Sequence, residues 1–191
     1  MLLIIGITGA SGAIYGIRLL EILKQLDKVE THLIITKSGE NVIKCETTYE
    51  VSEVKKLANF WYDIDDIGAC LSSGSFLTDG MVVTPCSMRT MSAIANSYAD
   101  NLLVRAADVT LKERRTLILL ARETPLHQGH LRNMLHLAEM NAIILPPVPS
   151  FYHMPKNIDD IVVHTVAKVL DLLAIKHTLS QRWGEVQRYT R

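Results

Sequence analysis

The chain opens with Met1-Leu-Leu-Ile-Ile-Gly-Ile-Thr-Gly-Ala-Ser-Gly12, an apolar run followed at once by a turn of small residues. The run over residues 2–7 is apolar throughout, which is typical of a strand buried on both faces of a parallel sheet. A helical pattern begins near Ala13. Gly9 and Gly12 allow positive φ or a close approach, and Ser11 offers a hydroxyl near unpaired helix N–H groups. This order predicts a phosphate-binding turn at the amino end of a helix, although such turns also occur without a ligand.

Composition limits the class of protein. The 191 residues are 48% hydrophobic, enough for one well-buried domain. Twenty basic and twenty acidic side chains give a formal net charge of zero, which disfavours nucleic acid as a partner. The three cysteines are odd in number and lack C-x-x-C spacing, so they indicate reduced thiols in a cytoplasmic protein. No apolar run has the length of a membrane span, and the first run lacks the basic flank of a signal peptide.

Apolar runs alternate with helical patterns along the chain. Strands are predicted over residues 2–7, 32–36, 81–84, 116–121 and 142–145. Helices are predicted over residues 13–26, 87–95, 101–114, 126–140 and 158–175, and the last is expected to close the core. The region 49–75 is less regular and is expected to mix a short helix with surface loop. This alternation predicts a doubly wound α/β domain with a parallel sheet covered on both faces. We expect one domain over residues 1–191, with a tail from about residue 177.

Ligands of such sheets bind beyond the carboxyl ends of the strands, so the residues that follow each strand indicate the site. In chain order these are Gly9, Ala10 and Ser11; Thr36, Lys37 and Ser38; the turn Pro85-Cys-Ser-Met-Arg-Thr90; Arg122 and Glu123; and Pro146-Pro147. Small hydroxyl residues, two arginines and a carboxylate therefore meet at one edge of the sheet. The set predicts a site for a phosphorylated ligand.

A dinucleotide is one candidate ligand. The spacing Gly6-x-x-Gly9-x-x-Gly12 resembles the opening of short-chain dehydrogenases, and Tyr152-x-x-x-Lys156 mimics their catalytic pair. However, the second strand ends in Thr36-Lys37, with no acid for a ribose hydroxyl. Pro155 also breaks the helix that would align the tyrosine and lysine. A mononucleotide fits better, because Ser87 and Thr90 can hydrogen-bond phosphate and Arg89 supplies charge.

Several motifs spread over nearly the whole chain resemble one family, the UbiX and phenolic-acid-decarboxylase-associated flavin prenyltransferases. They are Gly6-Ile-Thr-Gly-Ala-Ser-Gly12, Pro85-Cys-Ser-Met88, Arg105-Ala-Ala-Asp108, Leu111-Lys-Glu-Arg-Arg115, Arg122-Glu123, Pro146-Pro147, Phe151-Tyr-His153 and Arg182-Trp183. The resemblance implies a three-layer, Rossmann-like (flavodoxin-type) fold. It also implies a homo-oligomer of twelve copies, a dodecamer. It implies transfer of the dimethylallyl group of dimethylallyl monophosphate to N5 and C6 of reduced FMN, without a metal. The product, prenylated FMN, would serve a UbiD-type decarboxylase.

The resemblance also implies roles for single residues. The flavin would be held by Gly9, Ala10, Ser11, Thr36, Ser87, Met88, Arg89, Thr90 and Arg122. The dimethylallyl phosphate would be bound by Arg105, Lys112, Glu123, Tyr152 and Lys168; many family members carry arginine where Lys168 stands. Metal-free cleavage needs cationic and proton-donating groups at the leaving phosphate, so Lys112 and Glu123 would be catalytic, with Glu123 giving up a proton. Glu46 would take the proton lost on ring closure, with Ser11 relaying or orienting it.

Simpler interpretations remain for these residues. Arg105, Asp108 and Lys112 share one helix face and could form a solvated charge ladder. Glu123 could be an ordinary partner of Arg122, and Glu46 a polar residue near a helix end. His127, His130 and His136 lack the further ligands of a zinc site. Cys86 is more typical of a small buried residue than of a nucleophile.

Two other functions compete with prenyl transfer. One is a flavin-dependent decarboxylase of the peptidyl-cysteine or phosphopantothenoylcysteine type, a family that shares the fold and has segments similar to Ile94-Ala-Asn96 and Ala99-Asp-Asn-Leu102. Its Pro-Ala-Ser-Ala-Asn-Thr motif is replaced here by Pro85-Cys-Ser-Met-Arg-Thr90, and its Pro-x-Met-Asn motif has no match. The third hypothesis is a non-catalytic FMN carrier subunit.

Overall fold

The computed structural model describes residues 1–180, and internal contacts divide the chain into two units, Met1–Pro146 and Pro147–Arg191. Arg182-Trp183 and most of the predicted tail lie outside the described residues. Within residues 1–180, no helix is both long enough and apolar enough to cross a membrane.

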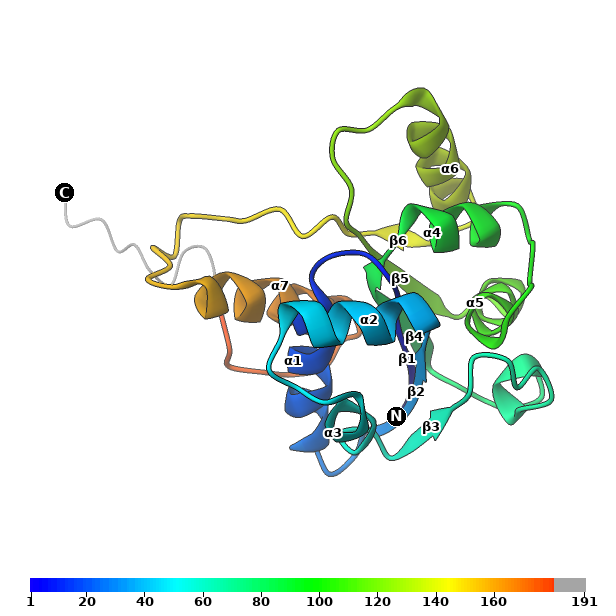
Figure 1. Cartoon of the computed structure of the whole chain (residues 1–191), viewed down its shortest axis with the longest axis horizontal. Helices are drawn as coiled ribbons and strands as arrows, with labels where there is room; N and C mark the ends of the chain where they lie inside the picture. The colour runs from blue at the N-terminus through cyan, green and yellow to red at the C-terminus, as the bar shows by residue number, and fades with distance from the viewer. Residues whose placement is uncertain (181–191) are drawn as a thin grey trace. The chain divides into compact units, whose positions relative to one another are not determined.

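The first unit is built on a six-stranded parallel sheet in the order β3-β2-β1-β4-β5-β6 (Figure 1). The strands are β1 (Leu2–Ile7), β2 (Glu30–Ile35), β3 (Phe60–Tyr62), β4 (Gly80–Cys86), β5 (Thr116–Ala121) and β6 (Ile143–Ile144). This is the Rossmann order, and without the edge strand β3 it is the order of flavodoxin. The doubly wound parallel sheet predicted from the sequence is confirmed. Its strand order reverses between β1 and β4, which makes their carboxyl ends the expected ligand site.

Helices follow most of the strands. They are α1 (Ala13–Lys24), α2 (Lys37–Glu46), α3 (Val51–Lys55), α4 (Met88–Ala95), α5 (Leu102–Lys112) and α6 (Gln128–Glu139), with a short 3₁₀ helix, η1 (Cys70–Ser72). The second unit contains α7 (Ile158–Leu172), whose first turn is fixed by a capping box between Asn157 and Asp160. All five predicted strands and all five predicted helices are present, with ends shifted by up to three residues.

Two elements of the fold, α2 and β3, are not predicted from the sequence. Helix α2 buries only Gly39 and Ile43, so its apolar periodicity is too weak to mark a helix. Strand β3 is three residues long and lies at the edge of the sheet, where Phe60 and Trp61 are half exposed. The short helix expected within residues 49–75 corresponds to α3, and β3 occupies part of the expected loop.

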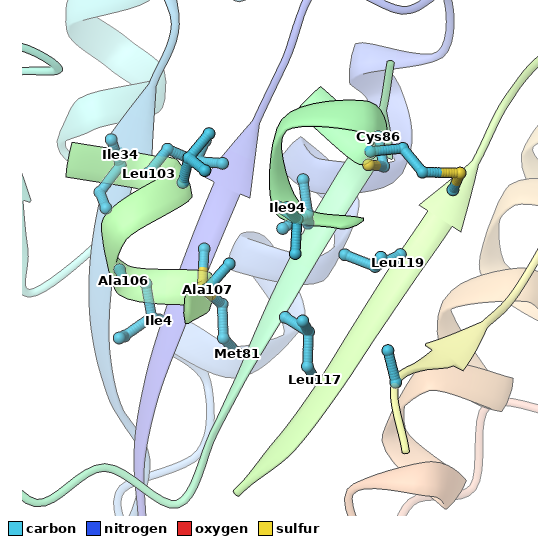
Figure 2. Close-up of a cluster of buried hydrophobic side chains, with 14 of the residues drawn as sticks. Ile4, Ile34, Met81, Cys86, Ile94, Leu103, Ala106, Ala107, Leu117 and Leu119 are labelled. Atoms are coloured by element: carbon cyan, nitrogen blue, oxygen red, sulfur yellow. The ribbon is translucent and has the colours of Figure 1, made fainter. Parts of the chain in front are cut away.

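One face of the sheet packs against α4 and α5. Figure 2 shows Ile4, Met81 and Leu117 from neighbouring strands in contact with this helical layer, and all three are buried. Leu103 and Ala107 of α5 fill the space above the central strands. This packing holds the amino ends of α4 and α5 at the edge where the strands end.

The other face meets α1 at very short range. A Cβ atom on Gly16 would lie 2.4 Å from the carbonyl oxygen of Thr84 and 3.0 Å from the side chain of Ile7. Only glycine therefore lets α1 approach the carboxyl ends of β1 and β4 this closely.

We predict that Gly16→Ala lowers the free energy of unfolding by about 1–3 kcal/mol, because the added methyl overpacks this contact. Denaturant unfolding measures the change. Gly68→Ala is the matched control, because a Cβ there meets nothing nearer than 3.5 Å, and it should cause no loss. A Gly16→Ala protein as stable as the wild type would contradict the close packing.

Candidate functional site

A cavity of about 390 Å³ opens at the point where the strand order reverses. Five of the residues predicted to bind flavin line it: Gly9, Thr36, Ser87, Arg89 and Thr90. The other lining residues are Lys37, Ser38, Ile64, Asp65, Ala93, Asp100, Asn101 and Val104. Ala10, Ser11, Met88 and Arg122 are near these residues in the fold but are not among those that line the cavity. The volume lies in the range of pockets that enclose a small-molecule ligand.

The buried hydroxyl of Thr8 joins the two turns that bound this cavity. Its Oγ1 donates a hydrogen bond to the Pro85 carbonyl at 2.7 Å and accepts one from the Ser87 N–H at 2.9 Å. Thr8 is fully buried, so its hydroxyl depends on these two partners within the protein. Thr8 is not among the site residues predicted from the sequence. A polar residue directly after an apolar strand, before Gly9, was the available signal.

Three helix amino ends line the cavity, those of α2, α4 and α5, and the first two are capped by hydroxyl side chains. Thr36 caps α2, where its hydroxyl accepts from the Gly39 N–H at 3.0 Å, and Ser87 caps α4, where it accepts from the Thr90 N–H at 3.4 Å. A Cβ on Gly9 would lie 2.4 Å from Cβ of Ser38, so only glycine fits where the first turn passes α2. Backbone N–H groups and hydroxyls from two helix starts therefore converge, an arrangement suited to an anion.

The charges around the cavity are paired. Lys37 contacts Asp65 at 2.7 Å, and Arg89 lies 3.6 Å from Asp100. The hydrogen bond to Asp65 raises the pKa of Lys37, which stays a cation. Because the two pairs cancel, anion binding here relies on hydrogen-bond donors more than on net positive charge.

Glu46 reaches the first turn from the end of α2. Its Oε2 accepts a hydrogen bond from the Gly12 N–H at 2.7 Å, and Gly12 has φ 103°, which favours glycine. The structure therefore brings Glu46 beside Ser11, as the predicted pairing requires. Both side chains are exposed.

Arg122 and Glu123 follow β5 at the same edge. The Arg122 N–H donates to the Cys86 carbonyl at 3.3 Å, which holds this segment beside the β4 turn. Within residues 1–180, Glu123 forms no ion pair with Arg122, and its Oε1 accepts from the Thr124 N–H at 3.1 Å. Burial raises the pKa of the Cys86 thiol to about 12, so this cysteine is neutral and is not poised as a nucleophile.

Lys112 and Arg105, both on α5, do not line the cavity described above. Lys112 ends α5 and pairs with Glu113, while Arg105 pairs with Asp108 at 2.8 Å and donates to the Ser72 carbonyl at 3.1 Å. Lys112 lines a second cavity of about 720 Å³ with Thr116, the first residue of β5. Glu123 follows the other end of that strand. Six strand residues at about 3.3 Å each separate the two edges by roughly 20 Å, so one chain does not bring Lys112 to Glu123.

The second unit places Tyr152 beside the middle of α7. Oη of Tyr152 lies 3.4 Å from Nε2 of His164, and Lys168 follows His164 by four residues on the same helix. Residues four apart share a helix face, so Tyr152 lies near the face that carries Lys168. The predicted pairing of Tyr152 with Lys168 is compatible with this geometry.

The histidines of α6 have local partners. Nδ1 of His127 accepts from the Gly129 N–H at 3.0 Å and caps the helix, and the rings of His127 and His130 are 3.6 Å apart. Over residues 1–180, no group of three or more His, Cys, Asp or Glu side chains could hold a metal ion.

Comparison with known proteins agrees with this geometry. The family model "Flavoprotein" matches residues 1–174. The flavin prenyltransferase UbiX of Salmonella typhimurium is 54% identical over 183 residues, 95% of this chain and 97% of that protein. A dodecameric FMN-dependent UbiX-like decarboxylase from Escherichia coli O157:H7 has a TM-score of 0.95 at 49% identity, covering 96% of this chain and 99% of that one.

A third structure, AnUbiX (PadA1) in complex with FMN and dimethylallyl pyrophosphate, has a TM-score of 0.94 at 47% identity, covering 95% and 96% of the two chains. The chain therefore belongs to the flavoprotein family and, within it, to the UbiX flavin prenyltransferases.

We predict that Thr8→Val lowers the free energy of unfolding by about 1–3 kcal/mol, because the partly buried Ser87 N–H loses its acceptor. The same change should weaken FMN binding, since the Ser87–Thr90 turn loses its tie to β1. Denaturant unfolding and a flavin fluorescence titration measure the two effects.

Thr110→Val is the control for this prediction. The Thr110 hydroxyl donates to the Ala106 carbonyl at 2.8 Å within α5, where that carbonyl already has a helical partner. The control should leave FMN affinity unchanged. Equal effects of the two substitutions would contradict the role given to Thr8.

Proposed function

We propose that this chain is a flavin prenyltransferase that joins the dimethylallyl group of dimethylallyl monophosphate to N5 and C6 of reduced FMN. The observation that carries the proposal is the cavity where the strand order reverses, lined by the starts of α2 and α4. Membership of the UbiX flavin prenyltransferases supports the reaction.

The residues around this cavity fit a flavin mononucleotide. Hydroxyls and N–H groups at Thr36 and Ser87 suit the phosphate of the nucleotide, because helix amino ends favour anions. The approach of Gly9 to Ser38 leaves room for backbone rather than side chain at the cavity wall. We assign flavin binding to these residues together with Ala10, Ser11, Met88, Arg89, Thr90 and Arg122. The bound, reduced flavin supplies the nucleophilic N5 and C6 atoms.

The chain's own groups handle the protons. We propose that Glu123 is protonated when the substrate is bound and donates this proton to the bridging oxygen of the leaving phosphate. In the described part of the chain, Glu123 has no ion pair with Arg122 that would favour its ionised form. The Glu46 carboxylate, held by the Gly12 N–H, accepts the proton lost on ring closure, and Ser11 orients this carboxylate. Tyr152 and Lys168 bind the substrate phosphate. Positive charge near the phosphate stabilises the charge that develops as the C–O bond breaks.

Lys112 and Arg105 act, in this proposal, on the site of a neighbouring copy. Lys112 lies at the opposite sheet edge from Glu123 of its own chain, and Arg105 stands two turns before it on α5, so a second copy is needed to bring Lys112 to the site. Leu131 and Leu135 of α6 are 51% and 62% exposed, which supports packing between copies. We propose a dodecamer, the assembly named for the relative from Escherichia coli O157:H7.

We further propose that residues 1–191 act as one flavoprotein domain in the cytoplasm, where the three free cysteines stay reduced. The prenylated FMN is passed to a UbiD-type decarboxylase.

The direct test is mass spectrometry of the flavin released after anaerobic incubation of the protein with reduced FMN and dimethylallyl monophosphate. We expect FMN that carries one added five-carbon group. Binding of both compounds without this product would overturn the proposed reaction, and CO₂ release from a cysteinyl peptide would support the decarboxylase alternative instead.

Glu123→Gln should keep FMN affinity and reduce kcat by about 10²–10⁴-fold, because the amide cannot donate a proton to the leaving group. Stopped assays of product and a flavin titration separate the two effects. Asp27→Asn is the control, because it neutralises an exposed carboxylate in the turn after α1, and it should keep full activity. An unchanged kcat in Glu123→Gln would support a carrier that does not catalyse.

Mixing two inactive variants tests whether Lys112 acts between copies. Lys112→Met and Glu123→Gln should each be inactive alone. After subunit exchange at equal amounts, about a quarter of the sites combine an intact Lys112 with an intact Glu123 from different copies, so activity should return in part. If both residues acted within one chain, every chain would stay defective and no activity would return.

A further inference from the structure

His164 is a polar side chain that the mechanism above does not use. Its Nε2 atom lies 3.4 Å from Oη of Tyr152, and the tyrosine ring meets the imidazole nearly edge-on, with centroids 5.5 Å apart and planes at 80°. In this contact either the phenol donates to the imidazole or the imidazole donates to the phenol oxygen. His164 therefore aims a hydrogen-bonding atom at the same place as a residue that binds phosphate in the proposed function.

A second imidazole fixes the ring of His164. His153 stacks on it with centroids 4.3 Å apart and an angle of 7° between the planes. Nδ1 of His153 lies 3.4 Å from Oγ of Ser150. A ring stacked on one side and contacted edge-on from another loses little further freedom when a ligand binds, which favours its use in binding.

Lys168 stands one turn after His164 on α7, on the same helix face. A lysine offers a point charge, whereas a planar guanidinium offers two parallel donors to the oxygens of one phosphate. A phosphate monoester has three terminal oxygens. Tyr152 and Lys168 can each serve one of them, and within this unit His164 is positioned to serve the third.

We propose that His164 is a third phosphate-binding side chain of the prenyl-donor site, donating Nε2–H to a terminal oxygen of the allylic monophosphate. The inference rests on the proposed function, which places that phosphate at Tyr152 and Lys168. His164 and Lys168 together then provide the two separate donors that one arginine would provide alone.

The surroundings set the charge of this donor. Burial, and to a smaller extent His153, lower the pKa of His164, so the imidazole is neutral at pH 7. Among residues 147–180, the titratable groups that face it are Tyr152 and His153 before α7, with Lys168 and Asp160 one turn away on α7. Asp160 is engaged by the backbone N–H groups of Lys156 and Asn157. Below the pKa of His164 the ring gains a positive charge, so phosphate binding should tighten as the pH falls.

The test compares two substitutions at this position. His164→Leu keeps the bulk and removes the donor, and it should raise the KM for dimethylallyl monophosphate roughly tenfold, the size expected for one hydrogen bond to a charged oxygen. The kcat and the KM for FMN should not change. His164→Gln keeps an N–H donor near the same position, so its KM at pH 7 should stay within about twofold of the wild type. Its KM should lack the extra tightening at low pH.

A compensating change adds a second criterion. Lys168→Arg in the His164→Leu background should restore most of the lost affinity, because the guanidinium supplies both donors. An unchanged KM in His164→Leu would overturn the inference. Equal rises in the KM values for FMN and for the prenyl donor would also overturn it, because they would indicate general disruption.

A measurement that needs no turnover separates this inference from the proposed function. The His164 ring resonances of the wild-type protein are followed by NMR against pH, with and without inorganic phosphate. A bound phosphate anion should raise the pKa of His164, and the same shift should be absent in Lys168→Met protein if the two residues share one ligand. Wild-type protein that forms no prenylated flavin yet shows this shift would overturn the reaction alone, and an active protein without the shift would overturn the role of His164 alone.

Discussion

The hydroxyl of Thr8 is the contact on which the carboxyl edge of this sheet depends. Parallel strands fix where β1 and β4 end, but they do not fix how the two following turns lie against each other. The Thr8 hydroxyl ties them together, because it bonds to the Pro85 carbonyl and the Ser87 N–H at once, and the Thr8 backbone N–H adds a hydrogen bond to the same carbonyl at 3.3 Å. The turn that begins α4 is thereby held against the turn that begins α1. The close approach of Gly16 to the Thr84 carbonyl also fixes α1 against the end of β4 by steric contact.

The arrangement of charged residues follows from the strands between them. β5 begins near Lys112 and ends before Glu123, so its length separates two residues that the family resemblance assigns to one substrate. Such a separation is a feature of the chain's topology, and no side-chain rotation closes it. Arg115 illustrates the local role of the same motif, since its guanidinium donates to the carbonyls of Gly74 and Phe76 and anchors the loop before β4. The motif that ends α5 therefore combines a folding role with the proposed binding role.

The sequence predicts the sheet, because strands such as residues 2–7 and 116–121 are apolar throughout and the helices between them have clear periodicity. It predicts the edge at which the cavity opens, because Gly9 and Ser87 each follow a strand. It does not predict α2 or β3, whose stability comes from contacts with the rest of the fold more than from their own patterns. Nor does spacing reveal Thr8 or His164, because a hydroxyl or imidazole acquires its role only from partners far away in the sequence.

The balance of charge at the cavity mouth has a kinetic consequence. Lys37 and Arg89 are matched by Asp65 and Asp100, so the opening projects little electric field into solvent. In the proposed function, a flavin is therefore not drawn in from a distance, and short-range donors at the helix starts retain it once it has arrived. Entry and departure at such an opening vary little with ionic strength, which suits a protein that must surrender a phosphorylated product as readily as it admits the precursor.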